Sequence, residues 1–166
     1  MIIAVFIIIY VGCIGHAMWT DATRMKISNS VSIILIVAFL LFAAIYLPIK
    51  PAIGHIGVAA AVFVVMFCCY ALRCLGGGDV KLLSALSMWI GPLHILPFLT
   101  AVALLGGVFS AFILCARRIK SHERQANRSP IMKHITTWTE IGRVPYALPI
   151  GAAALIHTRT IFGSWL

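Results

Sequence analysis

The sequence predicts an all-α, polytopic membrane protein with six transmembrane helices, and three observations carry this prediction. Of the 166 residues, 62% are hydrophobic and only 10% are charged, whereas a soluble domain has about 25% charged residues. The hydrophobic residues form long runs, most of them close to the roughly 20 residues that cross a bilayer. Lys and Arg lie between these runs, where basic residues set the orientation of membrane proteins.

The limits of the six spans follow from the charged residues, prolines and glycines that interrupt the apolar runs. The first run has no basic residue before it and leads directly to Asp21, so we interpret it as a span and not as a cleaved signal peptide. Gly91-Pro92 divides a later run whose single charge is Lys81 into a short span and a longer one. A polar loop at 20–30 and a turn at 48–54 separate the first three spans. The predicted spans, within one membrane domain of residues 1–166, are approximately 1–19, 31–47, 55–72, 80–90, 95–116 and 144–162.

The segment 117–143 is the long polar part of the chain. Ser129-Pro130 suits a helix N-cap followed by a proline in the first turn. Apolar residues then recur at helical spacing, namely Ile131, Ile135, Trp138 and Ile141. This pattern predicts a basic helix on the membrane surface. A solvated linker is an equal alternative, because the apolar face is narrow.

The basic residues are distributed unequally between the two sides of the membrane. Six spans place Lys50 and Arg159 on one side and the other eleven Lys and Arg residues on the opposite side. The positive-inside rule puts these eleven in the cytoplasm and both termini outside, in the periplasm or extracellular space. Because the charges flank apolar spans, we expect the lipid bilayer as a partner and no nucleic acid.

Asp21 and Asp79 are the two aspartates of the chain, and each lies at the cytoplasmic edge of a predicted span. An aspartyl protease needs two carboxyl groups a few ångströms apart that share one proton, because like charges at that distance cannot both ionise. The ionised group activates water and the protonated group polarises the scissile carbonyl. The two residues can meet if the first and fourth spans are neighbours. Spacing alone leaves open the alternative that both acids are simply solvated at span ends.

Glycines support this interpretation. We expect Gly76, Gly77 and Gly78 to give the backbone unusual conformations and to let an extended substrate approach the main chain. Lys81 either neutralises Asp79 or extends to the interface. Gly106-Gly107 predicts close helix packing. The histidines lack the paired spacing of metal ligands, and no cofactor or metal is predicted.

Three motifs in order resemble those of type IV prepilin peptidases. Gly76-Gly77-Gly78-Asp79-Val80-Lys81 resembles the GxGD-x-K motif, and Asp21 with Lys26-Ile27-Ser28-Asn29 resembles the first-aspartate motif, with Ser28 where proline is usual. Val144-Pro145-Tyr146-Ala147 through Gly151 resembles the motif of the last span. The resemblance implies a GxGD-protease-like fold, Asp21 and Asp79 as catalytic residues, and supporting roles for Gly76, Gly77, Gly78, Lys81, Lys26, Asn29, Pro145 and Tyr146.

The resemblance also implies a location and a substrate. Such enzymes lie in the bacterial inner membrane and cleave the basic leader from prepilins or pseudopilins at the cytoplasmic face. Larger members carry a domain with two Cys-x-x-Cys pairs in the first loop and also methylate the new N-terminus. Here about ten residues form that loop, so we predict a peptidase without N-methyltransferase activity, similar to the compact enzymes of Tad/Flp pilus systems. We expect the apolar helix of the substrate to lie against the first and fourth spans.

Two other classes of function remain open at this point. One is a small ion- or proton-coupled transporter that uses Asp21 and Asp79, since ionisable residues within membranes are usually functional. The other is a non-catalytic subunit of a pilus or secretion assembly.

Overall fold

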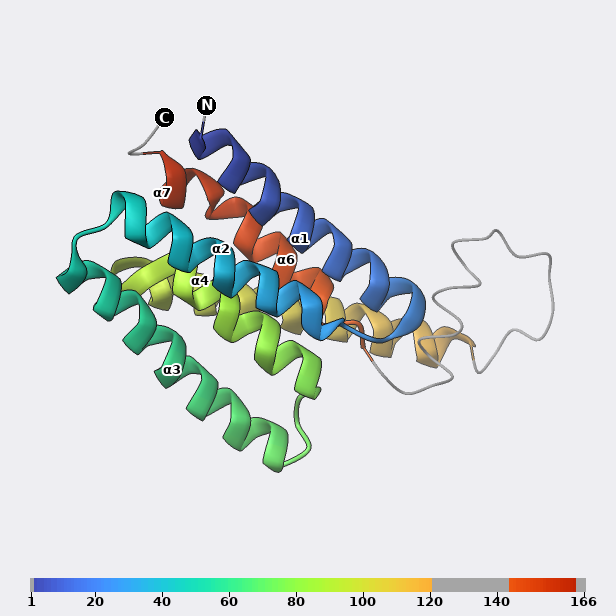
Figure 1. Cartoon of the computed structure of the whole chain (residues 1–166). Coiled ribbons are helices and arrows are strands. Elements are labelled where there is room, and N and C mark those ends of the chain that lie inside the picture. The colour runs from blue at the N-terminus through green and yellow to red at the C-terminus, as the bar shows by residue number, and fades with distance from the viewer. Residues whose placement is uncertain (1, 121–143, 164–166) are drawn as a thin grey trace.

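The structure, a computed structural model, describes residues 2–120 and 144–163, and helices are the regular elements found there (Figure 1). The predicted surface helix around 131–142 lies outside the described residues, as does most of the predicted loop 117–143. The helices are α1 (Ile2–Arg24), α2 (Asn29–Tyr46), α3 (Ile49–Ala71), α4 (Gly77–Lys120), α6 (Ala147–Ile156) and α7 (Thr158–Phe162).

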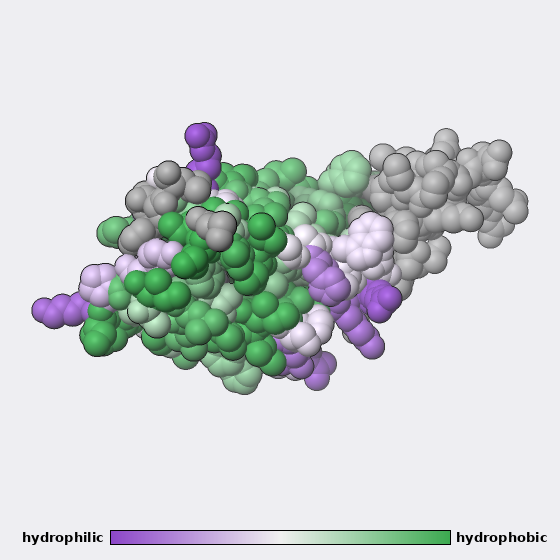
Figure 2. Space-filling model, turned by 45° about the horizontal axis from the view of Figure 1, so that its top comes forward, coloured by the Kyte–Doolittle hydropathy of each residue, from purple (hydrophilic) through white to green (hydrophobic). Residues whose placement is uncertain are grey.

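The described helices have the length and composition of a membrane protein. Four are long and apolar enough to cross a bilayer, namely α1, α2, α3 and the part of α4 from Gly77 to Cys115, and α6 is a shorter apolar helix. Apolar side chains cover the middle of the molecular surface, and hydrophilic side chains gather towards its two ends (Figure 2). The prediction of an all-α membrane protein is confirmed, whereas the count of six spans is not confirmed.

A break at Gly91 divides α4 into two helical arms. Gly91 has φ 73° and ψ 176°, which are not helical values, and Pro92 then starts the second arm, where its missing N–H has no cost. The chain reverses direction at this point (Figure 1). The carbonyl of Met88, four residues before Pro92, accepts a hydrogen bond from Nδ1 of His55 on α3 at 2.8 Å. The sequence predicted this break correctly, and the backbone angles inside α4 that are not helical are those of Gly91.

Three predicted boundaries are wrong. Helix α1 continues through half of the predicted loop 20–30, because residues 20–24 include no glycine or proline to end it. Within this part the hydroxyl groups of Thr20 and Thr23 donate to carbonyls one turn earlier, at 2.9 and 2.7 Å. Helix α3 begins at Ile49 inside the predicted turn 48–54, since Pro51 in a first turn displaces no helical hydrogen bond. The last predicted span is two helices, α6 and α7, with His157 between them.

An aromatic cluster holds the helices together away from the loops. The Trp89 ring of α4 lies 5.4 Å from Tyr10 of α1 and 5.6 Å from both Phe42 of α2 and Phe162 of α7. Its indole N–H donates to the Leu35 carbonyl of α2 at 3.0 Å. Because both termini of the described chain contribute to this cluster, it ties α1 and α7 to the same end of the bundle.

Helix α6 packs against both α1 and α4 (Figure 1). Its Gly151 allows a close approach, because a Cβ there would lie 2.5 Å from Sδ of Met18 on α1. As a result, the end of α1 and the starts of α2, α4 and α6 meet at the end of the bundle opposite the aromatic cluster.

Candidate active site

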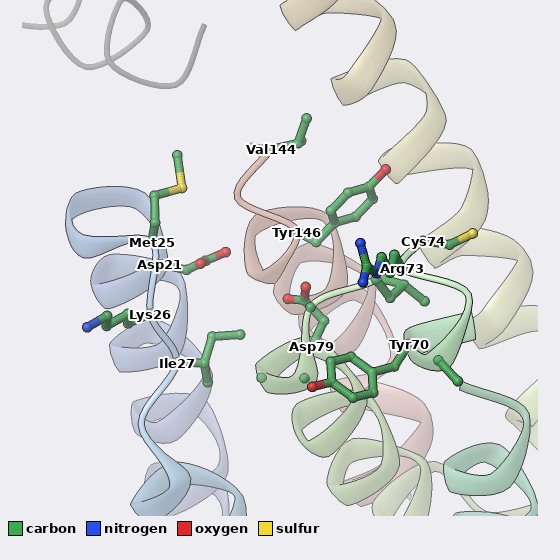
Figure 3. Close-up of a pocket in the computed structure, with 15 residues that line it drawn as sticks. Asp21, Met25, Lys26, Ile27, Tyr70, Arg73, Cys74, Asp79, Val144 and Tyr146 are labelled. Carbon is green, nitrogen blue, oxygen red and sulfur yellow. The ribbon is translucent and has the colours of Figure 1, made fainter. Parts of the chain in front are cut away.

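A cavity of about 890 Å³ lies where these helix ends meet (Figure 3). Asp21 lines it from α1 and Asp79 from α4, and Tyr146 lines it from the segment that enters α6. The remaining walls are the α1–α2 connection and the segment that joins α3 to α4. The cavity therefore brings together all three motifs that the sequence separates.

Asp21 is buried, with 7% of its surface exposed, in the last turn of α1. Its Oδ2 accepts a hydrogen bond from the N–H of Ala147 at 2.9 Å. Ala147 is the first residue of α6, and the first N–H groups of a helix have no partner within the helix. The side chain of Tyr146 makes no capping hydrogen bond. The carboxylate of Asp21 therefore caps α6 and is held in one orientation by it.

Asp79 is the third residue of α4, and a hydrogen bond from the backbone N–H of Gly76 holds its carboxylate. This is one half of a capping box, in which an acid in the first turn reaches back to the residue before the helix. The Asp21 carboxylate interacts electrostatically with Asp79. Both side chains point into the same space (Figure 3). The structure thus brings the two predicted residues together.

Gly76 and Gly78 are distinguished by close contacts and not by unusual backbone angles. Among the described glycines a positive φ occurs at Gly91, so the expectation of unusual backbone conformations at Gly76, Gly77 and Gly78 is wrong, because the last two form the first turn of α4. A Cβ at Gly76 would lie 2.8 Å from Oδ2 of Asp79, and one at Gly78 would lie 3.1 Å from Cβ of Ile27. One at Gly77 would make an ordinary contact of 3.4 Å with the Tyr70 ring.

The other predicted support residues divide into two groups. Lys26 and Tyr146 line the cavity, and the Tyr146 hydroxyl is hydrogen bonded to Ser110 at 3.1 Å. Lys81 and Asn29 are not among its lining residues; the ammonium group of Lys81 donates to Asn29 Oδ1 at 2.9 Å, which ties the start of α2 to the start of α4.

Two further supports have plain structural roles. Pro145 is fully buried beside Tyr146. Ser28 caps α2, since its hydroxyl oxygen accepts from the N–H of Ser30 at 3.3 Å. The serine thus supplies a helix cap in the position where the motif usually has proline.

Sequence reasoning missed several lining residues, notably Met25, Tyr70, Arg73 and Cys74. Met25 (φ 52°) and Arg73 (φ 60°) follow the ends of α1 and α3 in the left-handed conformation. After α3, Arg73 and Cys74 donate to the carbonyls of Tyr70 and Cys69, which is a Schellman motif. Glycine is the usual residue in this conformation, so without it the sequence carried no signal for these turns.

No group of three or more His, Cys, Asp and Glu among the described residues lies close enough to hold a metal ion.

The family comparison agrees with the cavity. A model of the type IV leader peptidase family matches residues 5–111, which is more than half of the chain and includes both aspartates. The chain belongs to the type IV leader peptidase family. Searches of curated proteins and of solved structures give no match. The prediction from the motifs is thereby confirmed at the level of the family. In this leader peptidase family member the matched region ends before residues 144–151, so the third motif is tied to the site by the hydrogen bond between Asp21 and Ala147.

Proposed function

We propose that the protein is a membrane-embedded aspartyl endopeptidase that removes the basic leader from prepilins or pseudopilins, with Asp21 and Asp79 as the catalytic pair. One observation carries the proposal. Two acids separated by 57 intervening residues line one cavity and interact electrostatically, in a chain of the leader peptidase family. Each carboxylate is also held by a backbone N–H, which is the preorganisation that catalysis requires.

The proposed chemistry uses the two carboxyl groups in different protonation states. The ionised carboxylate takes a proton from a water molecule, whose oxygen attacks the scissile carbonyl carbon. The protonated carboxyl group donates its hydrogen to the carbonyl oxygen. The tetrahedral intermediate then breaks its C–N bond, and the leaving amine takes a proton from the pair. One hydroxyl group of the intermediate returns its proton to the pair as the new carboxyl terminus forms. The pair ends with one proton, as it began.

We also propose that the chain crosses the bacterial inner membrane six times. In this arrangement each arm of α4 crosses once, and α6 together with α7 forms the last crossing. The charges of the described residues support it, because Arg24, Lys26, Arg73 and Lys81 lie in or near the cavity end, whereas Lys50 and Arg159 follow helix boundaries at the other end. The cavity end then faces the cytoplasm, and the two termini face the periplasm.

The decisive experiment is cleavage of a co-expressed prepilin by Asp21→Asn and Asp79→Asn variants. Each is expected to reduce cleavage by roughly 10³-fold or more, and the double variant to be no worse than either single one, because the pair acts as a unit. Lys50→Gln, at the other end of the bundle, is the control and keeps full activity. Near wild-type cleavage by either Asn variant would refute the pair, and a loss of ion-dependent uptake instead would indicate a transporter.

The pH dependence gives a second readout of the same experiment. Because one carboxyl group must be protonated and the other ionised, the cleavage rate is expected to follow a bell-shaped curve whose two limbs belong to the pair. A rate that rises to a plateau without a second limb would contradict a shared proton.

We further propose that the protein lacks N-methyltransferase activity, as in compact Tad/Flp-type enzymes. The short connection supports this, since α1 ends at Arg24 and α2 begins at Asn29 with no room for an inserted domain. Mass spectrometry of the mature pilin from cells with this enzyme alone is expected to show an unmodified N-terminus. An N-terminal methyl group that is present in cells with this enzyme and absent when its gene is deleted would contradict the proposal.

A further inference from the structure

A second cavity, of about 530 Å³, adjoins the first one and differs from it in chemistry. It lies among α3, the two arms of α4 and α6. Leu75, Asp79 and Tyr146 line both cavities, so the two are adjacent at Asp79. Apart from Asp79 and Tyr146 its lining residues are apolar or glycine, whereas the first cavity also contains Lys26 and Arg73.

The wall formed by the second arm of α4 is smooth over two helical turns. Leu99, Val102, Ala103, Gly106 and Gly107 lie on one face, at the spacing of helix neighbours. Gly107 is exposed, and a Cβ there would meet no atom within 4 Å. A Cβ at Gly106 would touch the Tyr146 ring at 3.5 Å. The expectation of close helix packing therefore does not hold at Gly107, where the cavity floor is open.

Helix α6 lies between the two helices against which we expected the apolar helix of the substrate. It packs against both α1 and α4, and Met18 and Ile14 of α1 lie within 3.0 Å of where a Cβ of Gly151 would be. The space between α1 and α4 is thus occupied by α6. The second cavity, in contrast, leads directly away from Asp79.

We propose that the second cavity binds the apolar segment that follows the scissile bond of the substrate, and that Gly107 provides room for its side chains. This inference rests on the proposed function. The polar leader of such a substrate then lies in the first cavity and its apolar helix in the second. The bond to be cut lies between them, at Asp79. Close packing of apolar side chains against the cavity wall contributes to binding, because van der Waals contacts drive association within a bilayer.

The first test fills the cavity. Gly107→Leu is expected to lower kcat/KM for the prepilin that the wild-type enzyme cleaves by about tenfold or more, equivalent to about 1.4 kcal/mol, because the new side chain fills the space that apolar side chains of the substrate would occupy. Gly57→Leu on α3 is the matched control, since Gly57 is also exposed and a Cβ there also meets nothing within 4 Å. It is expected to cleave at the wild-type rate.

The second test does not depend on cleavage, and it does not introduce a bulky side chain that could prevent folding. In an Asp79→Asn chain with no other cysteine, Gly107→Cys is expected to form a disulfide with a cysteine two helical turns beyond the cleavage site of the prepilin. Gly57→Cys is expected to form none.

The outcomes separate the two proposals. A wild-type rate for Gly107→Leu, or no disulfide from position 107, overturns the assignment of the second cavity to the substrate. Lipid acyl chains are then the occupant of this cavity. Failure of the proposed function is seen elsewhere, in cleavage that survives Asp79→Asn.

Discussion

At the scale of single residues, backbone groups hold both carboxylates of the candidate site, and there is little space for a side chain beside Asp79. The backbone N–H of Gly76 and that of Ala147 hold the two carboxylates, so main-chain groups from two helix starts fix the orientation of both acids. A side chain at Gly76 would meet Asp79 itself, whereas one at Gly77 would meet the Tyr70 ring at an ordinary distance. Neighbouring glycines of one motif therefore have different functions.

The three glycines give a matched series for a test. Gly76→Ala is expected to lower the cleavage rate by about tenfold or more, because a Cβ 2.8 Å from Oδ2 displaces the carboxylate and small misplacements in active sites are costly. Gly78→Ala is expected to have a smaller effect through Ile27. Gly77→Ala is the control and is expected to stay near the wild-type rate. Equal losses in all three variants would contradict this explanation and indicate a need for backbone freedom.

At the scale of elements, the break in α4 decides how the second cavity forms. Gly91 permits the reversal, Pro92 restarts the helix, and His55 supplies the hydrogen bond that Pro92 cannot give to the Met88 carbonyl. The His55 ring also stacks on Phe39 at 5.5 Å and fills the space beside Gly91. Helix α3 therefore holds the turn between the two arms of α4.

Thermal unfolding in detergent tests this arrangement. Gly91→Ala is expected to destabilise the protein by about 2 kcal/mol or more, from left-handed strain and from the overlap of the new Cβ with the His55 ring. His55→Ala is expected to cost about 1–3 kcal/mol, because the Met88 carbonyl loses its partner. Combined, the two are expected to cost less than their sum, since removal of the ring relieves the clash. Gly57→Ala is the control, and strict additivity of the pair would contradict the contact.

At the scale of the whole molecule, the candidate site lies at one end of the bundle and the aromatic cluster at the other. The aromatic cluster around Trp89 joins α1, α2, α4 and α7 at one end, and the cavity opens at the other. The apolar surface between them matches the hydrocarbon of a bilayer (Figure 2). A cavity at a helix end gives water and a polar leader access without crossing the apolar belt.

Cys74 reports which side of the membrane the cavity faces, because it is exposed and lines the cavity. In a variant that keeps this cysteine alone and still cleaves prepilin, an impermeant maleimide is expected to label inside-out vesicles and not right-side-out ones. A chain without cysteine is the control for background labelling. Labelling from the periplasmic side would reverse the proposed orientation.

The sequence by itself determined the class of the protein and the identity of its acids. Long apolar runs with few charges belong in a bilayer, so the all-α membrane fold was readable from composition. The order of the motifs singled out Asp21 and Asp79 as the candidate pair. The break at Gly91 was readable for the same local reason, since glycine followed by proline cannot continue a helix.

Only the tertiary structure decided how these parts meet. No local signal announces that Asp21 caps α6 across 126 residues, that His55 serves the Met88 carbonyl, or that Met25 and Arg73 adopt left-handed turns. Helix α3 begins earlier than predicted because a proline in its first turn displaces no helical hydrogen bond. These features depend on which helix packs beside which, and that is set by contacts between residues far apart in the chain.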